Sequence, residues 1–183
     1  MPKMNSVCVF CASSPKASQS LKNLATDLGQ KIAKKEISLV YGGTSIGLMG
    51  SLASGANKFG GKIIAIFPEI FLEKGIDFTE ADEFILTEDL RERKALMEKR
   101  SDAFIALPGG VGTLDEITEI LTLIQLKQIS KPLILINHQN FFGPIITFFD
   151  AVIEQKLAKK KFLKSFYLAK DNDDAIDFLT NYR

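Results

Sequence analysis

A glycine-rich loop that runs into a helix is the segment of this chain best suited to chemistry. After Asp102–Leu107, an apolar run that predicts a buried strand, the sequence continues as Pro-Gly-Gly-Val-Gly-Thr-Leu-Asp-Glu, ending at Glu116. Backbone N–H groups at such a loop and at the helix start attract anions, and Thr113 adds a hydroxyl donor. The segment therefore predicts a phosphate site with the Glu116 carboxylate beside it.

The residues that the loop lacks narrow the kind of phosphate. Gly110-Val111-Gly112-Thr113 is not followed by the Gly-Lys-Ser/Thr of a Walker sequence, and it does not form Gly-x-Gly-x-x-Gly. A triphosphate with Mg²⁺ is therefore disfavoured, and a single monophosphate fits better. The alternative interpretation is a tight strand-to-helix turn that binds no ligand.

Glu116 has two interpretations. With Thr113 as N-cap and Glu116 as the third helical residue, the pair has the spacing of a capping box, which would make Glu116 structural. Alternatively, Glu116 and Glu119 form a carboxylate pair on one helix face, which continues as Leu123 and Leu126. The neighbouring face is the predicted buried one and consists of Ile117, Ile120, Leu121 and Ile124. A catalytic Glu116 close to a subunit contact is the second interpretation.

An arginine on an earlier helix is the other candidate for chemistry. In the predicted helix 89–100, Leu90, Arg93 and Met97 share a face, so Arg93 lies between two apolar residues, and Lys94 follows it. The planar guanidinium suits recognition of phosphate or carboxylate. A snorkelling arginine with a buried stem is the alternative.

Strands and helices alternate along the rest of the chain. Strands are expected at 6–11, 37–41, 62–67, 84–87, 103–107, 132–136 and 166–169, and helices at 18–35, 46–59, 89–100, 113–127, 141–155 and 173–180. We expect residues 68–83 to form a loop. The strands are continuous apolar runs, as in a parallel, doubly wound α/β sheet covered on both faces.

Ligands of such sheets bind at the carboxyl ends of the strands. Three loops rich in glycine or serine are expected at that edge, namely 12–14, 42–45 and 109–113.

The composition argues against several classes of protein. The 183 residues are about one domain's worth, so we expect a single domain, 1–183. A net charge of +1 predicts no binding to nucleic acid or to a membrane surface, and the apolar runs are too short to span a bilayer. The first residues lack a signal-peptide pattern, which favours the cytoplasm.

Other reactive residues carry weaker signals. Cys8 and Cys11 have redox spacing, but they fall on a strand, where side chains three apart point to opposite faces, so we expect small buried residues. His138 is expected in a surface loop, and Lys159-Lys160-Lys161 with Lys164 in a solvated turn. We expect no metal site, because the sequence contains no Cys/His cluster, and we expect no cofactor.

Three motifs together resemble the LOG ("Lonely Guy") family. They are Tyr41-Gly42-Gly43-Thr44-Ser45-Ile46-Gly47-Leu48-Met49-Gly50, then Arg93-Lys94-Ala95-Leu96-Met97, then Ser101 through Pro108-Gly109-Gly110-Val111-Gly112-Thr113-Leu114-Asp115-Glu116. The resemblance runs from about Cys8 to the last helix. It implies a Rossmann-like fold and a homodimer or larger homo-oligomer.

The implied activity is that of a cytokinin riboside 5′-monophosphate phosphoribohydrolase, which releases the base and ribose 5-phosphate from N6-modified AMP and in many members from AMP. The family's older label, lysine decarboxylase, would require pyridoxal phosphate, and nothing in this sequence supports such a site. A general nucleoside 5′-monophosphate nucleosidase and a non-catalytic nucleotide- or cofactor-binding module are the alternatives.

The resemblance also implies roles for individual residues. Arg93 and Glu116 match the catalytic pair. The positions that match substrate contacts are Ser13, Ser14, Gly43, Met49, Lys94, Gly110, Val111, Gly112, Thr113, Leu114, Asp115 and Thr122. This chain departs from the family pattern at Thr44, where a third glycine is usual, and near Gly75, where the family has a glutamate and the nearest one here is Glu73.

Overall fold

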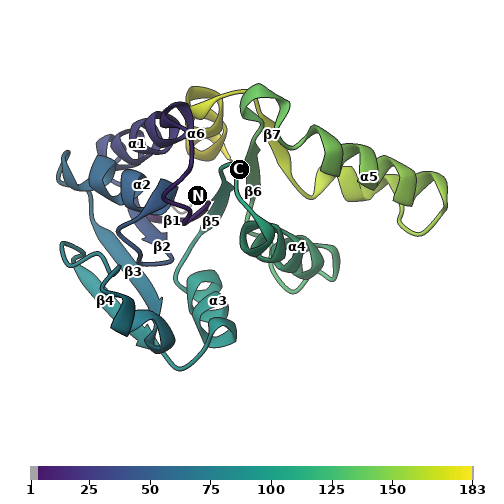
Figure 1. The fold of residues 1–183 in the computed structure, drawn as a ribbon. Helices are drawn as coiled ribbons and strands as arrows, with labels where there is room; N and C mark the ends of the chain where they lie inside the picture. The colour runs from purple at the N-terminus through teal and green to yellow at the C-terminus, as the bar shows by residue number, and fades with distance from the viewer. Residues whose placement is uncertain (1–3, 183) are drawn as a thin grey trace.

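The computed structural model describes residues 4–182 and contains one seven-stranded sheet (Figure 1). The strands are β1 (Ser6–Phe10), β2 (Ser38–Tyr41), β3 (Ile63–Pro68), β4 (Glu83–Thr87), β5 (Ala103–Ala106), β6 (Leu133–Ile136) and β7 (Tyr167–Ala169). Their order is β4-β3-β2-β1-β5-β6-β7, and every neighbouring pair is parallel. The order reverses direction at β1, which confirms the predicted doubly wound α/β fold.

Helices cover both faces of the sheet. The helices α1 (Gln19–Lys34), α2 (Gly47–Asn57) and α6 (Asn172–Asn181) contribute buried residues to one apolar cluster. The helices α3 (Leu90–Lys99), α4 (Val111–Gln125) and α5 (Gly143–Glu154) contribute to a second cluster on the opposite face. The strands lie between the clusters, which explains why they are apolar on both sides.

Alternation along β1 and the residue that follows it places the two cysteines in different clusters. Cys11 packs with α1 and α2, whereas Cys8 packs on the face covered by α3 and α4. Both thiols are buried and free. The expectation that they act as small buried residues is confirmed.

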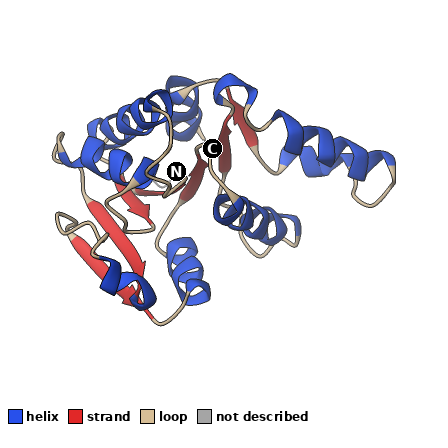
Figure 2. Cartoon of the chain, in the orientation of Figure 1, coloured by secondary structure: helices blue, strands red, loops and turns tan. Residues whose placement is uncertain are grey.

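The segment between β3 and β4 differs from the prediction. Residues Glu69–Lys74 form a 3-10 helix, which ends at Gly75 in the left-handed region with φ of 59°. Two further 3-10 turns, His138–Asn140 and Lys160–Lys164, also interrupt predicted loops (Figure 2). Such short turns leave no amphipathic period, so the sequence pattern could not reveal them. Within residues 4–182, no helix is long and apolar enough to cross a membrane.

Candidate active site

The predicted loops meet at the carboxyl edge of the three central strands. The sheet places β1 between β2 and β5, so the loops that follow these strands are neighbours. Ala12 accepts hydrogen bonds from the N–H groups of Leu48 (2.9 Å) and Met49 (3.3 Å) at the start of α2. Gly47 has a φ of 64°, and a Cβ there would lie 2.4 Å from the carbonyl carbon of Ser13. The first two loops are thus locked together.

The third loop leads into α4 two residues earlier than predicted. The helix begins at Val111, and its N-cap is Gly110 in extended conformation, without a side-chain capping bond. Thr113 is therefore inside the helix, and its side chain folds against Gly109. The predicted capping box, with Thr113 as N-cap and Glu116 as third residue, is wrong, because the glycines allow the helix to start before Thr113.

Glu116 is paired with Arg93 instead. The Nη2 atom of Arg93 donates a hydrogen bond to Oε1 of Glu116 at 2.5 Å. Only 13% of the Arg93 side chain and 3% of the Glu116 side chain are exposed. The pair joins α3 to α4 and connects the two motifs that the sequence singled out. Arg93 is therefore not a snorkelling surface residue, since its charged end faces a buried carboxylate.

Burial dominates the protonation of this carboxyl group. Desolvation raises the pKa of Glu116 to about 7, while the positive charges of Arg93 and Lys94 oppose the rise and Asp115 adds to it. A carboxyl group with a pKa near neutrality can exchange a proton with substrate or water at physiological pH. The site can therefore support acid–base chemistry.

The second loop contacts the arginine directly. A Cβ placed on Gly42 would lie 3.0 Å from Nη1 of Arg93 and 3.2 Å from the end of the Met49 side chain. The backbone after β2 therefore approaches the guanidinium closely. The Nε atom of Arg93 is buried and has no hydrogen-bond partner among the described residues. This guanidinium N–H is thus a donor that is not used within residues 4–182.

Lys94 forms a second, more exposed bridge between the same helices. Its Nζ lies 2.8 Å from Asp115 and 2.6 Å from Glu119. These two hydrogen bonds raise the pKa of Lys94. Glu116 and Glu119 do face α3 together, as their spacing indicated, but each pairs with a different cation there.

The other predicted substrate-contacting positions differ in how exposed they are around the Arg93–Glu116 pair. Ser13, Ser14, Gly110 and Gly112 are at the same edge, and a Cβ on either of these glycines would meet nothing within 4 Å. Val111, Leu114 and Asp115 are exposed on the first turn and a half of α4, whereas Gly43 and Met49 are buried.

Thr122 lies well away from the glycine loop. It stands 11 residues after Val111, about 16 Å along the helix. Its hydroxyl donates to the carbonyl of Thr118 at 2.7 Å.

The two departures from the family pattern are visible in the structure. The Thr44 side chain is buried, and its hydroxyl donates to the carbonyl of Ile76 at 2.9 Å. This bond ties the second loop to the segment after the 3-10 helix. Glu73 is exposed on that 3-10 helix.

The direct ion pairs are the part of the site that sequence reasoning missed. Neither the Arg93–Glu116 pair nor the Lys94 bridge was predicted, although both cations and all three carboxylates were. A usable signal was the spacing of Asp115 and Glu119, which places two carboxylates on one helix face four residues apart.

His138, expected on the surface, is half-buried, and its Nε2 atom has no partner within residues 4–182.

Comparisons with known proteins agree with these motifs. A family model described as "Possible lysine decarboxylase" matches residues 49–179. The chain is 37% identical over 177 residues to the cytokinin riboside 5′-monophosphate phosphoribohydrolase LOG5 of Arabidopsis thaliana, covering 97% of this chain and 78% of that protein. It is 35% identical to the probable cytokinin riboside 5′-monophosphate phosphoribohydrolase LOGL2 of Oryza sativa subsp. japonica, covering 96% and 72%.

Solved structures with the same fold include carrier proteins. A molybdenum cofactor binding protein from Rippkaea orientalis has a TM-score of 0.71 and 25% identity, covering 97% of this chain and 96% of that chain. The molybdenum cofactor carrier protein of Chlamydomonas reinhardtii has a TM-score of 0.72 and 23% identity, covering 96% and 95%. The family model and the curated relatives decide the assignment: this chain belongs to the family described as possible lysine decarboxylases, the LOG family that its motifs indicate.

Proposed function

We propose that this protein hydrolyses the N-glycosidic bond of adenosine 5′-monophosphate or its N6-modified forms, releasing the free base and ribose 5-phosphate. The observation that carries the proposal is the buried Glu116 carboxylate, held at 2.5 Å by Arg93 one and a half turns from an open glycine loop. The names of the curated relatives support the same reaction.

Glu116 supplies the charge that the reaction needs. Cleavage of an N-riboside passes through a transition state with oxocarbenium character, which a nearby carboxylate stabilises. Glu116 also takes a proton from the attacking water, whose oxygen bonds to C1′ while the base departs with the electron pair of the broken bond. The departing base gains one proton and Glu116 releases the proton that it took from water, so the net products are neutral base and ribose 5-phosphate and the carboxylate is restored.

The remaining site residues bind and orient the substrate. The N–H groups at the start of α4, with Gly110 and Gly112, hold the 5′-phosphate, since the positive end of a helix favours an anion. Arg93, whose side chain stays 13% exposed, anchors the nucleotide and assists departure of the base. Ser13, Ser14 and Met49 line the nucleotide from the other loops. This binding positions the ribose against Glu116.

Two alternatives remain distinct from this proposal. The first is a general nucleosidase whose main substrate is AMP. The second is a non-catalytic carrier, favoured by the likeness to the Rippkaea orientalis protein at 25% identity. The Arg93–Glu116 pair supports turnover, because it places a carboxyl group with a pKa of about 7 close to the glycine loop.

One assay separates the three possibilities. The purified protein is incubated with AMP and with N6-isopentenyl-AMP, and the free base is quantified by chromatography. We expect release of base, faster from the N6-modified nucleotide. Equal or faster release from AMP favours the general nucleosidase. Binding of either nucleotide without release of base would favour the carrier and contradict the proposal.

We further propose that the protein is a homodimer or a larger homo-oligomer. Apolar side chains are exposed along α4 and before and within α5, including Val111 (84%), Leu114, Leu126, Phe141 and Phe148. An exposed apolar surface of this kind is typical of a subunit contact. Light scattering coupled to size exclusion should give a multiple of the 20.2 kDa chain mass, and a monomer at micromolar concentration would contradict this.

A further inference from the structure

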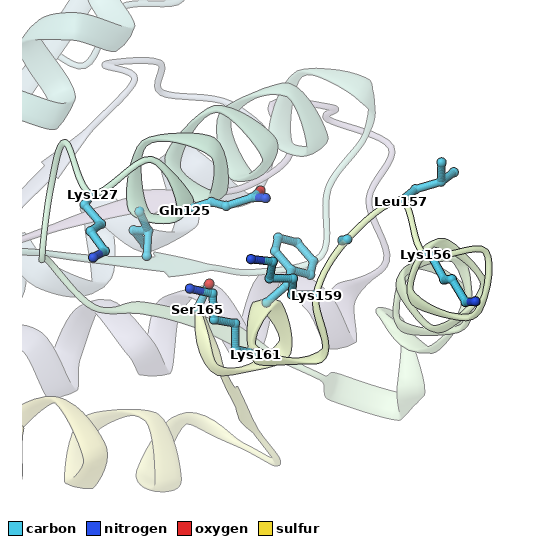
Figure 3. Close-up of a pocket in the computed structure, with 10 residues that line it drawn as sticks. Gln125, Lys127, Lys156, Leu157, Lys159, Lys161 and Ser165 are labelled. Carbon is cyan, nitrogen blue, oxygen red and sulfur yellow. The ribbon is translucent and has the colours of Figure 1, made fainter.

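A hollow lies at the opposite end of α4 from the glycine loop. It has a volume of about 510 Å³ and is formed by the end of α4 and the segment after α5. Figure 3 shows one space that is surrounded by Gln125, Lys127, Lys159, Lys161 and Ser165. Lys156 points away from this space. The volume is within the range of small-molecule sites.

The lysines around this hollow carry uncompensated charge. Within the described part of the chain, no ion pair involves Lys127, Lys159 or Lys161, and no carboxylate lines the hollow. Residues 155–170 contain six lysines and neither aspartate nor glutamate, although the chain as a whole has a net charge of only +1. The segment after α5 is therefore locally basic, although the chain as a whole is nearly neutral.

The backbone also holds Lys127 in an unusual conformation. Its φ of 58° lies in the left-handed region just after α4, where glycine is preferred. Lys156 has the same conformation after α5, with φ of 60°, but its side chain points elsewhere. A lysine at such a position interacts favourably with the helix C-terminus, which explains both residues. The helix end does not explain Lys159 and Lys161, which line the same hollow as Lys127 but come from the segment after α5.

We propose that this hollow binds a small anion with two or more linked phosphates, such as a pyrophosphate or the polyphosphate of a nucleotide. Lys127, Lys159 and Lys161 would neutralise the charge, and Ser165 and Gln125 would donate hydrogen bonds to it. The site is separate from the proposed catalytic centre, because α4 has 15 residues and is therefore about 22 Å long.

The number of lysines favours linked phosphates over a single one. A phosphate monoester carries a charge of about −1.5 to −2 at pH 7, which leaves part of three lysine charges uncompensated. A diphosphate balances them more closely. Single-stranded nucleic acid usually follows a groove lined with stacking aromatic side chains. Here the lining has one aromatic residue, Phe162, whose ring already packs edge-on against Phe149 at 5.0 Å.

Calorimetric titration of the purified protein tests this proposal. Inorganic pyrophosphate, ATP without divalent metal, inorganic phosphate and a single-stranded oligonucleotide serve as separate probes at about 150 mM salt. We expect pyrophosphate to bind about tenfold or more tightly than phosphate. Comparison of pyrophosphate with ATP shows whether a nucleoside adds affinity.

Matched variants locate the binding. The double variant Lys159→Ala/Lys161→Ala and the single variant Lys127→Ala should each weaken pyrophosphate binding by about tenfold or more. Lys156→Ala has the same left-handed backbone as Lys127 and should change it by less than about twofold. Gly112→Ala, which places a methyl group at the glycine loop without a clash in the free protein, should leave pyrophosphate binding intact, so failure here is distinguishable from failure of the proposed hydrolase activity. Circular dichroism and thermal melting confirm that each variant is folded.

Three outcomes would overturn the proposal. The first is the absence of pyrophosphate binding to the unaltered protein at millimolar concentration. The second is loss of binding in Gly112→Ala with retention in the lysine variants, which would assign the anion to the glycine loop. The third is an oligonucleotide that binds more tightly than pyrophosphate and displaces it, which would make this surface a nucleic-acid site.

Discussion

Arg93 on α3 donates a 2.5 Å hydrogen bond from its Nη2 atom to Oε1 of Glu116 on α4, so that each buried charge has a partner of opposite sign. The carboxylate is almost fully removed from water, and a single guanidinium nitrogen reaches one of its two oxygens. Neither partner alone would be tolerated at this depth, because an unpaired buried charge is strongly destabilising. The pairing engages one guanidinium nitrogen and one carboxylate oxygen, and the remaining atoms of both groups are not used by it.

The rate of hydrolysis should fall as the pH is lowered through about 7. Burial raises the pKa of Glu116 to about 7, and the proposed reaction needs the ionised carboxylate, which becomes more populated as pH rises. We therefore expect kcat/KM to increase from pH 5.5 to 8 with a midpoint near the Glu116 pKa. A profile that is flat across this range would contradict the assignment of Glu116.

Two neighbouring charges should move this midpoint in opposite directions. Lys94 lowers the pKa of Glu116, so Lys94→Met should shift the midpoint to higher pH, whereas Asp115 raises the pKa, so Asp115→Asn should shift it to lower pH. The substrate phosphate also titrates near pH 6, but it is the same for every variant. Shifts of the same sign in both variants would show that another group controls the profile.

Gly112→Ala should separate anion binding from folding. A Cβ at this position meets nothing within 4 Å, so the free protein can accept it, and alanine favours the helix by about 1 kcal/mol over glycine. If the 5′-phosphate rests against this backbone, the methyl group occupies its space and KM rises. We expect an unchanged or higher melting temperature with a raised KM. An unchanged KM would place the phosphate elsewhere.

Gly47→Ala should break the contact between the first two loops. Its Cβ would lie 2.4 Å from the Ser13 backbone, and the residue has a positive φ of 64°. Gly60→Ala is a matched control, because Gly60 has a φ of 67° but its Cβ would meet nothing within 4 Å. Gly60→Ala should cost about 1–2 kcal/mol in the free energy of unfolding from backbone strain alone. A similar loss for both variants in denaturant titration would mean that Ser13 moves aside easily.

Cys8 and Cys11 should be inert in the native protein. Burial raises the pKa of both thiols, with the negative charge of Glu116 as a further cause. Because only the thiolate reacts, neither cysteine should be modified by a thiol reagent until the protein is unfolded. Unfolding in guanidinium should then reveal two reactive thiols per chain. Rapid modification of the native protein would indicate an opening of β1 that this structure does not contain.

The sheet and its covering helices were predictable because their signals are local and repeated. Continuous apolar runs mark β1, β2, β3, β5 and β6, and the period of α1 and α4 marks the helices between them. The strand order places the loops after β1, β2 and β5 together, and that expectation needed only the general rule for doubly wound sheets.

The start of α4 and the Arg93–Glu116 pair could not be predicted from local sequence patterns. Thr113 and Glu116 have perfect capping-box spacing, yet the preceding glycines let the helix begin at Val111, and this moves Glu116 beyond the first turn. Its partner lies 23 residues away on another helix. Long-range pairing depends on how α3 and α4 pack, which no local pattern encodes.

The most direct test of the catalytic claim is the rate of base release by Glu116→Gln, with N6-isopentenyl-AMP and AMP as substrates. Glutamine keeps the size and an oxygen acceptor for Arg93 but cannot act as a base or carry charge. The account predicts a folded protein that still binds nucleotide and releases base about 10²- to 10⁴-fold more slowly. Near-normal release of base by a correctly folded Glu116→Gln protein would contradict it.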